Sequence, residues 1–325
     1  MKLTVVGDPD NRPVKNEIDS EAMGGTELMK YALYEKLDKA LLSNFNIIPS
    51  RVRELSETKK NILWLHDLPQ DPESQHLKNG GWKKFDQLVF VSHWQKQQYE
   101  NFLGVPPSAG VVLQNAIDPV EMHEKPTDKV NIIYHTTPHR GLELLVPIME
   151  GIEKALPDVD WHLDVYSSFG VYGPSWEARN KPYEPLFEKL RSHDRMTYHG
   201  FVSNEEIKEA LKKAHIYAYP NIWPETSCIS MIEAMSAGCI VVHPTLAALP
   251  ETAANWTLMY DFHEDMQEHA NRHALTLMDA MRLTNDGNMV GRLQMQKSYV
   301  DGFYSWETRV QQWTVFLTSL LGQEK

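Results

Sequence analysis

Short apolar runs rich in β-branched residues alternate with segments of helical periodicity along almost the whole chain, and this alternation constrains the fold most. It is typical of parallel α/β architecture. In the first part of the chain, strands are predicted at Leu3–Val6, Asn46–Pro49, Ile62–Leu65, Leu88–Val91 and Val111–Leu113. One long helix is predicted over Leu28–Leu42 and another over Gln95–Leu103.

A second α/β series follows a polar, proline-containing run at 121–128, which we interpret as a linker. Strands are predicted at Val130–Tyr134, Trp161–Tyr166, Met196–Tyr198, Ile216–Tyr219 and Ile240–Val242, and helices at Leu142–Leu156, Asn204–Ala214 and Cys228–Ala237. The segment Trp306–Leu321 is amphipathic and predicts a terminal helix. The sequence therefore predicts two α/β domains, 1–125 and 126–303, with the helix at 304–325 packing back on the first.

Composition and charge narrow the class of protein. The apolar opening is too short for a signal peptide, and no run could span a bilayer. Two cysteines imply no disulfide framework, so we expect a reducing, cytoplasmic setting. The net charge of −12 argues against nucleic acid as a partner. A basic, aromatic patch at 78–85 could make weak peripheral contact with a membrane at most. The alternative is an exposed helix end or loop whose lysines reach solvent beside packed aromatic rings.

The segment 219–238 carries the most chemical information. It is predicted to run from a strand through a loop into a helix that stops at Gly238. Thr226 or Ser227 is placed to cap that helix, which leaves neighbouring amides to face an anion. Glu225 precedes the helix and Glu233 lies inside it. This arrangement suits a nucleoside diphosphate sugar, with phosphates at the helix start and one carboxylate each for sugar and ribose.

An alternative reading of Glu233 remains open at this point. Ser230 and Glu233 have the spacing of a capping box, which would leave the glutamate on a solvated helix face. A carboxylate among Ile229, Ile232 and Met235 is otherwise costly to bury unless donors satisfy it.

Glu225 and Glu233 form an E-x7-E element, followed by Ala-Met-x-Ala-Gly and an apolar strand. This frame resembles the donor-site signature of GT-B glycosyltransferases, specifically the retaining family 4 group. The resemblance implies an α/β fold of two Rossmann-like domains with parallel sheets facing across a cleft, an N-terminal acceptor domain and a C-terminal nucleotide-sugar donor domain. It also implies a ribose contact for Glu233 and a sugar contact for Glu225, with a hydroxyl compound as acceptor.

Other segments resemble landmarks of the same family. Gly24-Gly25 resembles the glycine turn where backbone approaches phosphate, and a plain strand-to-helix turn would also explain it. Gly200, Phe201 and Val202 resemble the turn that packs on the nucleobase. The family often places a histidine near the reacting centre, where His66 ends a strand; a structural role is the alternative. The donor-binding prediction also includes the residues of the loop before the helix, Thr226, Ser227, Cys228 and Ile229.

One position departs from the family pattern. The family supplies an arginine and then a lysine to the donor diphosphate, and here these positions hold His135 and Arg140. Arg140 can clamp phosphate, and a surface cap of its helix is the alternative. His135 could still donate to phosphate, or Thr136 and Thr137 could substitute for the missing arginine. We therefore assign Glu225, His66 and Arg140 to catalysis and His135 and Thr136 to donor binding.

No metal site or cofactor is expected. His269 and His273 share a helical spacing, but a solvated polar face is the default reading, and Asp158 and Asp160 lack further ligands. Asp8 and Asp10 could touch the acceptor. Two other functions stay open: another GT-B enzyme, such as a phosphorylase or nucleotide-sugar epimerase, and a nucleotide-sugar-binding protein without catalysis.

Overall fold

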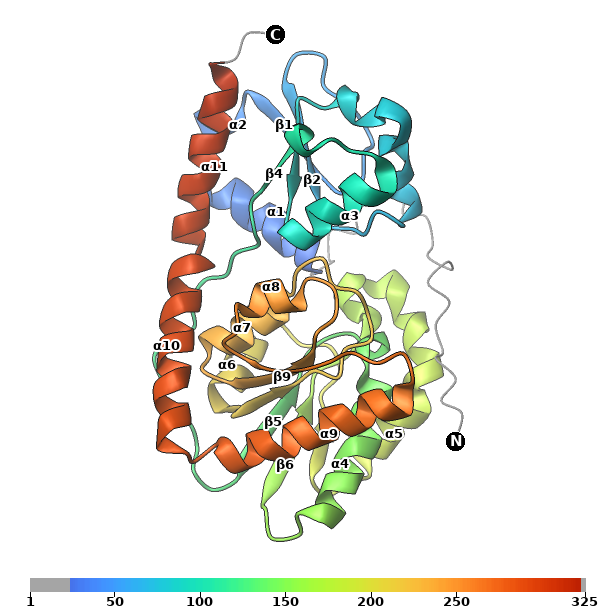
Figure 1. The fold of residues 1–325 in the computed structure, drawn as a ribbon, viewed down its shortest axis with the longest axis vertical. Helices are drawn as coiled ribbons and strands as arrows, with labels where there is room; N and C mark the ends of the chain where they lie inside the picture. Colours follow the sequence, from blue (N-terminus) through green and yellow to red (C-terminus); the bar gives the residue numbers. More distant parts are fainter. Residues whose placement is uncertain (1–23, 323–325) are drawn as a thin grey trace.

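The computed structural model describes residues 24–322, which form two parallel β-sheets flanked by helices (Figure 1). The first sheet has the order β1-β2-β3-β4 and the second the order β10-β9-β8-β5-β6-β7. The strands of the first are β1 (Phe45–Pro49), β2 (Lys60–Leu65), β3 (Gln87–Phe90) and β4 (Gly110–Val112). The strand predicted at Leu3–Val6 lies outside the described residues.

The helices of the first domain are α1 (Gly25–Lys36), α2 (Lys39–Leu42) and α3 (His93–Leu103). The prediction of one helix over Leu28–Leu42 was wrong. Leu37 is extended, and the Asp38 side chain accepts a hydrogen bond from the amide of Leu41 at 2.7 Å, so Asp38 caps a new helix. The apolar periodicity continues across this break because Leu33, Leu37 and Leu42 are all buried.

The second sheet contains β5 (Val130–Tyr134), β6 (Trp161–Val165), β7 (Met196–Tyr198), β8 (Ile216–Ala218), β9 (Ile240–Pro244) and β10 (Leu258–Tyr260). Its helices are α4 (Leu142–Ala155), α5 (Glu184–Arg191), α6 (Asn204–Lys213), α7 (Ile229–Ser236), α8 (Leu249–Ala253) and α9 (Met266–Leu283). Strands such as β8 and β9 are buried along their whole length, as expected for a parallel sheet covered on both faces.

The last two helices, α10 (Gly287–Phe303) and α11 (Trp306–Leu321), run along one side of the molecule (Figure 1). In α10, Gln296 donates hydrogen bonds to the carbonyls of Met235 and Cys239, so this helix packs on the second domain. In α11, Trp313 packs edge-on against Trp64 of β2 with ring centroids 5.1 Å apart. The chain therefore returns to the first domain at its end.

Three short 3-10 helices matter for the site that follows: η3 (Pro138–Arg140), η4 (Phe169–Tyr172) and η5 (Pro174–Tyr183). Two further ones, η1 (Pro72–Lys84) and η2 (Pro107–Ala109), belong to the first domain. η1 carries most of the basic, aromatic patch. Its lysines Lys83 and Lys84 are exposed, whereas Trp82 packs against the core of its own domain. Within residues 24–322, no helix combines the length and apolarity that a membrane span requires.

The prediction of a solvated polar face at His269 and His273 was wrong. Both side chains are fully buried, and both approach the hydroxyl of Tyr260, at 3.3 and 3.2 Å. Burial lowers the pKa of His273 well below its ordinary value, so this imidazole is neutral. The two histidines are core residues of α9 that share one tyrosine.

Candidate active site

A cavity of about 1010 Å³ lies at the carboxyl ends of the strands of both sheets. This is where ligands bind in open parallel α/β folds. Every residue that the sequence predicts for the site lines this cavity: Gly24, Gly25, His66, His135, Thr136, Arg140, Gly200, Phe201, Val202, Glu225, Thr226, Ser227, Cys228, Ile229 and Glu233. Asp8 and Asp10 lie outside the described residues.

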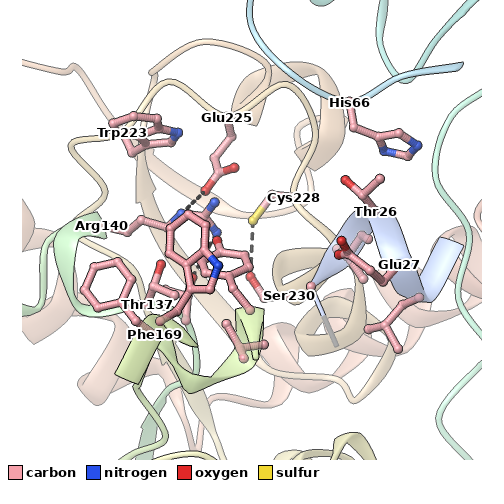
Figure 2. A pocket seen from close by; sticks show the side chains of 18 of the residues that line it. Thr26, Glu27, His66, Thr137, Arg140, Phe169, Trp223, Glu225, Cys228 and Ser230 are labelled. Atoms are coloured by element: carbon pink, nitrogen blue, oxygen red, sulfur yellow. Dashed lines mark hydrogen bonds and ion pairs between the residues drawn. The ribbon is translucent and has the colours of Figure 1, made fainter. Parts of the chain in front are cut away.

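Glu225 and Arg140 form an ion pair at the centre of the second domain's wall. Arg140 Nε lies 3.2 Å from Glu225 Oε1, and the same oxygen accepts a hydrogen bond from the Tyr219 hydroxyl at 2.6 Å (Figure 2). The Arg140 guanidinium also donates to Thr136 Oγ1 at 3.1 Å. Burial is the largest single effect and disfavours its charge, but Glu225 together with Tyr172, Tyr219 and Cys228 raises the pKa of Arg140. The arginine is thus a fixed cation that faces the cavity rather than a surface cap.

Glu233 is buried and does not form the capping box. It is 7% exposed, and its contact in the described chain is with Asn204, whose Nδ2 lies 3.4 Å from Oε1. Burial raises the pKa of Glu233 to about 7, since Lys208 and Asn204 compensate only in part. A carboxylate held this way in a cavity wall has acceptor capacity to spare for ligand hydroxyls.

The first turn of α7 is capped differently from the prediction. Cys228, not Thr226 or Ser227, is the N-cap residue, and its side chain caps no backbone amide of the helix within the described chain. Its thiol lies 3.3 Å from Ser230 Oγ, and burial raises the pKa of this thiol to about 12. The helix start therefore presents amides, together with a neutral thiol, to the cavity, which is a favourable setting for an anion.

His135 occupies the position of the expected arginine and is neutral. Its ring packs on Tyr217 with centroids 4.7 Å apart, and burial lowers its pKa to about 3 although it faces the Ser230 backbone. Because this imidazole carries no charge, it replaces the expected cation with hydrogen-bonding capacity only.

Thr226, in the loop before α7, connects the second domain to the first. Its hydroxyl donates to the carbonyl of His66 at 2.7 Å, and its own carbonyl accepts a bond from Ser92 Oγ at 2.6 Å. Nearby, the carboxylate of Glu251 accepts hydrogen bonds from the backbone amides of His93 and Trp94, both at 2.8 Å. These bonds explain why Thr226 does not cap α7, and they hold the two walls of the cavity together.

His66 lies at the end of β2 on the opposite wall from Arg140 and Glu225 (Figure 2). Its ring packs on Trp64 at 4.6 Å, and its Nε2 is buried without a hydrogen-bond partner among residues 24–322. Burial lowers the pKa of His66 to about 3. A neutral imidazole with an unsatisfied nitrogen facing a cavity is suited to bind a ligand hydroxyl.

Gly24 and Gly25 face side chains of the second domain. A Cβ on Gly24 would lie 3.1 Å from the Tyr172 ring, and one on Gly25 would lie 3.1 Å from Ile229 Cδ1. A side chain at either position would therefore force Tyr172 or Ile229 to shift, which is a reason for glycine beyond a simple turn.

The turn at 199–202 follows β7. Gly200 has φ of +71°, a region that favours glycine, while His199 bonds Asp164 at 2.7 Å and stacks on Tyr166 at 4.2 Å. The stack places the aromatic face of Tyr166 in the same part of the wall as Gly200, Phe201 and Val202.

Sequence reasoning missed two groups of cavity residues. One is aromatic and comes mainly from the segment after β6: Phe169, Tyr172, Trp176, Tyr183 and Trp223. The other is basic and comes from the first domain: Lys30, Arg51 and Arg53. The density of aromatic residues at 166–183, directly after a predicted strand, was a usable signal for the first group.

Metal ligands do not cluster in the described part of the chain. Within residues 24–322, no group of three or more histidine, cysteine or acidic side chains is arranged to hold a metal ion. Asp158 and Asp160 lie on the turn before β6, away from the cavity lining.

The paired parallel sheets and the cleft between them define a GT-B glycosyltransferase fold. Residues 121–282 match the family described as "Glycosyl transferases group 1", and through this region the chain belongs to that family. The match includes Arg140, Glu225 and Glu233 and ends inside α9.

Curated relatives match about half of the chain. A human phosphatidylinositol N-acetylglucosaminyltransferase subunit is 24% identical over 169 residues, which is 50% of this chain and 33% of that protein. The Arabidopsis thaliana protein of the same name is 25% identical over 173 residues, 51% of this chain and 36% of that protein. The chain thus matches about a third of the length of these relatives.

Solved structures match more of the chain at lower identity. A glycosyltransferase from Rickettsia africae superposes with a TM-score of 0.66 at 14% identity, over 93% of this chain and 82% of that one. Anabaena HepE, solved with UDP-glucose, gives a TM-score of 0.61 at 15% identity, over 80% and 72%. The pneumococcal O-GlcNAc transferase GtfA, solved with UDP and GlcNAc, gives 0.63 at 12% identity, over 91% and 60%. These likenesses establish the fold.

Proposed function

We propose that this chain transfers a sugar from a nucleotide-sugar donor to a hydroxyl acceptor, with retention of anomeric configuration and without a metal ion. The observation that carries the proposal is the wall formed by Arg140, Glu225 and the start of α7. It combines a fixed cation, uncapped helix amides and a carboxylate in one cavity, which is the set of groups that a sugar diphosphate requires.

The donor is proposed to lie along the second domain. Its diphosphate would face the first turn of α7 and Arg140, and its ribose hydroxyls would bond to Glu233. Glu225 would accept a hydroxyl of the donor sugar. Because Glu225 is already held by Arg140 and Tyr219, its orientation is fixed before the donor arrives.

The transfer step follows from these positions. The bond between the sugar's anomeric carbon and the diphosphate oxygen breaks, and the leaving diphosphate is stabilised by α7 amides and Arg140. The acceptor oxygen bonds to the anomeric carbon on the same face, and its proton passes to a diphosphate oxygen. Retention is proposed from the family resemblance. Neutral His66 would orient a sugar hydroxyl and take no part in proton transfer, because its pKa is about 3.

Two further parts of the proposal concern setting and donor. Free, buried Cys228 and Cys239 are compatible with a reducing, cytoplasmic location. The relatives that the chain resembles include an N-acetylglucosaminyltransferase by name and structures solved with UDP, UDP-glucose or GlcNAc. UDP-N-acetylglucosamine and UDP-glucose are therefore the first donors to test.

The test is a donor panel with matched variants. Purified protein is incubated with UDP-, GDP-, ADP- and dTDP-sugars, with and without chelator, and nucleoside diphosphate release is measured. We expect slow release from one donor, unaffected by chelator and lost in Glu233→Ala. With an added alcohol acceptor, the anomeric configuration of the product is read by NMR. Nucleotide binding without any turnover would instead establish a binding protein, and an inverted product would refute retention.

A further inference from the structure

The first-domain wall of the cavity carries a group of cations that the proposed reaction does not use. Lys30 projects from α1, and Arg51 and Arg53 follow the end of β1. All three line the cavity in a chain whose net charge is −12. Cations gathered in one wall of a cavity in an acidic protein attract an anionic ligand.

Two of these cations are free to meet a ligand. Arg53 is paired with Glu73 at 3.2 Å. Lys30 and Arg51 are half-buried, and their side chains form no hydrogen bond or ion pair with any described residue. Half-buried cations without a partner lose hydration and gain nothing in return until an anion binds.

The acidic groups on this wall leave Lys30 and Arg51 unpaired in the part of the chain that the structure describes. Glu27 and Asp67 also line the cavity. Glu27 folds back over its own helix start, with Oε2 only 2.7 Å from where a Gly24 Cβ would lie. Asp67 follows His66 at the end of β2. Neither carboxylate forms an ion pair with Lys30 or Arg51 in the described chain.

The local backbone positions Arg51 beside His66. Ser50 has φ of +56°, unusual for a residue other than glycine. Its amide donates to the carbonyl of Trp64 at 2.8 Å, and its Oγ accepts the amide of His66 at 3.0 Å. These bonds hold the turn after β1 in a strained conformation, and strain of this kind is typical of functional sites. Arg51 is the next residue and enters the cavity there.

We propose that the acceptor is an alcohol that carries a phosphate group, and that Lys30 and Arg51 bind this phosphate. The inference rests on the proposed function, which assigns the donor diphosphate to α7 and Arg140 on the other wall. With that wall occupied by the donor, the cations of α1 and the β1 turn face the remaining space, where the acceptor must lie.

The test measures binding of matched charged and uncharged probes with the donor site filled. The protein is saturated with the nucleoside diphosphate from the donor panel, so that added phosphate cannot occupy the donor site. Calorimetry then compares myo-inositol 1-phosphate with myo-inositol, and sedimentation compares vesicles containing phosphatidylinositol with phosphatidylcholine vesicles. We expect at least tenfold tighter binding of the net-negative member in at least one pair: inositol phosphate over inositol, or anionic phosphatidylinositol over zwitterionic phosphatidylcholine. Preference for the soluble phosphate indicates a free sugar phosphate as acceptor, and preference for the vesicles indicates a lipid headgroup.

The variants assign the binding to the two cations. The double variant Lys30→Ala with Arg51→Ala should lower the affinity for the phosphate-bearing probe at least tenfold. The control pair Lys59→Ala with Arg282→Ala, both exposed outside the cavity, should leave that affinity unchanged. The inference is overturned if charged and uncharged probes bind equally. It is also overturned if the Lys30→Ala, Arg51→Ala variant loses affinity for the nucleoside diphosphate and not for the probe. Absence of any nucleotide binding would refute the proposed function, and the probes, titrated without nucleotide, would still report on Lys30 and Arg51.

Discussion

The two walls of the cavity are built in different ways. On the second-domain wall, Arg140, Glu225 and Tyr219 are bonded to one another and Glu233 is buried. On the first-domain wall, Lys30 and Arg51 are half-buried and have no partner in the described chain. The first arrangement fixes its groups before a ligand arrives, as a constant substrate such as a nucleotide sugar permits. The second leaves its charges available to an anionic ligand.

The largest effect is expected from breaking the fixed wall at Glu225. Glu225→Ala removes the ion-pair partner of Arg140 and should lower the free energy of unfolding by about 2 kcal/mol. The loss is smaller than for a fully buried pair because the Arg140 side chain is 23% exposed. Turnover should fall at least a hundredfold. Urea denaturation and donor hydrolysis measure the two effects. Glu188→Ala, which removes an exposed ion pair, should change stability by less than about 0.5 kcal/mol. Equal effects of the two variants would show that the wall is not held by this pair.

Next in size is an effect of pH on stability through Glu233. Because burial raises its pKa from 4.5 to about 7, the unfolded chain ionises first as the pH rises, and stability falls between these values. Above pH 7 the cost reaches ~3 kcal/mol. Glu233→Gln should therefore raise the melting temperature at pH 8 and leave it nearly unchanged at pH 4, while it weakens nucleotide binding. Thermal unfolding at both pH values checks this, with exposed Glu124→Gln as control. A Glu233→Gln variant no more stable than wild type at pH 8 would contradict the buried, uncompensated carboxylate.

A smaller effect should follow from weakening the connection between the walls. Thr226→Val removes the hydrogen bond to the carbonyl of His66 and leaves that carbonyl unsatisfied, at a cost of about 1–2 kcal/mol in the closed arrangement. We expect kcat to fall about tenfold and the KM for the donor to change less than about twofold. Steady-state kinetics separates the two constants. The exposed variant Thr314→Val is the matched control. A rise in donor KM at constant kcat would mean that the Thr226 hydroxyl binds donor, as the sequence alone suggested.

The smallest effect concerns the thiols of the second domain. Cys228 and Cys239 are both buried, and burial raises the pKa of each. Little thiolate is present at pH 8, so a thiol reagent should label neither cysteine in the native protein and both in denaturant. Rapid native labelling that donor suppresses would show that the donor wall opens in solution, and the contrast between fixed and available walls would then need revision.

The sequence predicted the fold and the residues of the second-domain wall because both depend on local pattern. Buried parallel strands are continuous apolar runs, and the frame around Glu225 and Glu233 keeps its spacing within one strand–loop–helix unit. Contacts between distant segments could not be read in this way. Thr226 was predicted to cap α7, but its hydroxyl bonds His66, 160 residues away in sequence. His269 and His273 have polar spacing, yet the fold buries both against Tyr260.

The first-domain wall was less predictable for a related reason. Arg51 follows a left-handed serine, Ser50, that is stabilised by hydrogen bonds with Trp64 of β2 and with His66 just after it. Serine has no residue preference that would predict this conformation. The break in the first helix at Asp38 could have been predicted, because aspartate is a strong N-cap residue. The apolar periodicity that continues across Asp38 favoured one unbroken helix instead.

The second-domain wall is proposed to bind the donor and the first-domain wall to receive the acceptor. A crystal structure with the nucleoside diphosphate identified by the donor panel tests this division most directly. We predict the diphosphate at the first turn of α7 within reach of Arg140, the ribose hydroxyls on Glu233, and no nucleotide contact with Lys30 or Arg51. A diphosphate bound to Lys30 and Arg51, with the α7 wall empty, would contradict it.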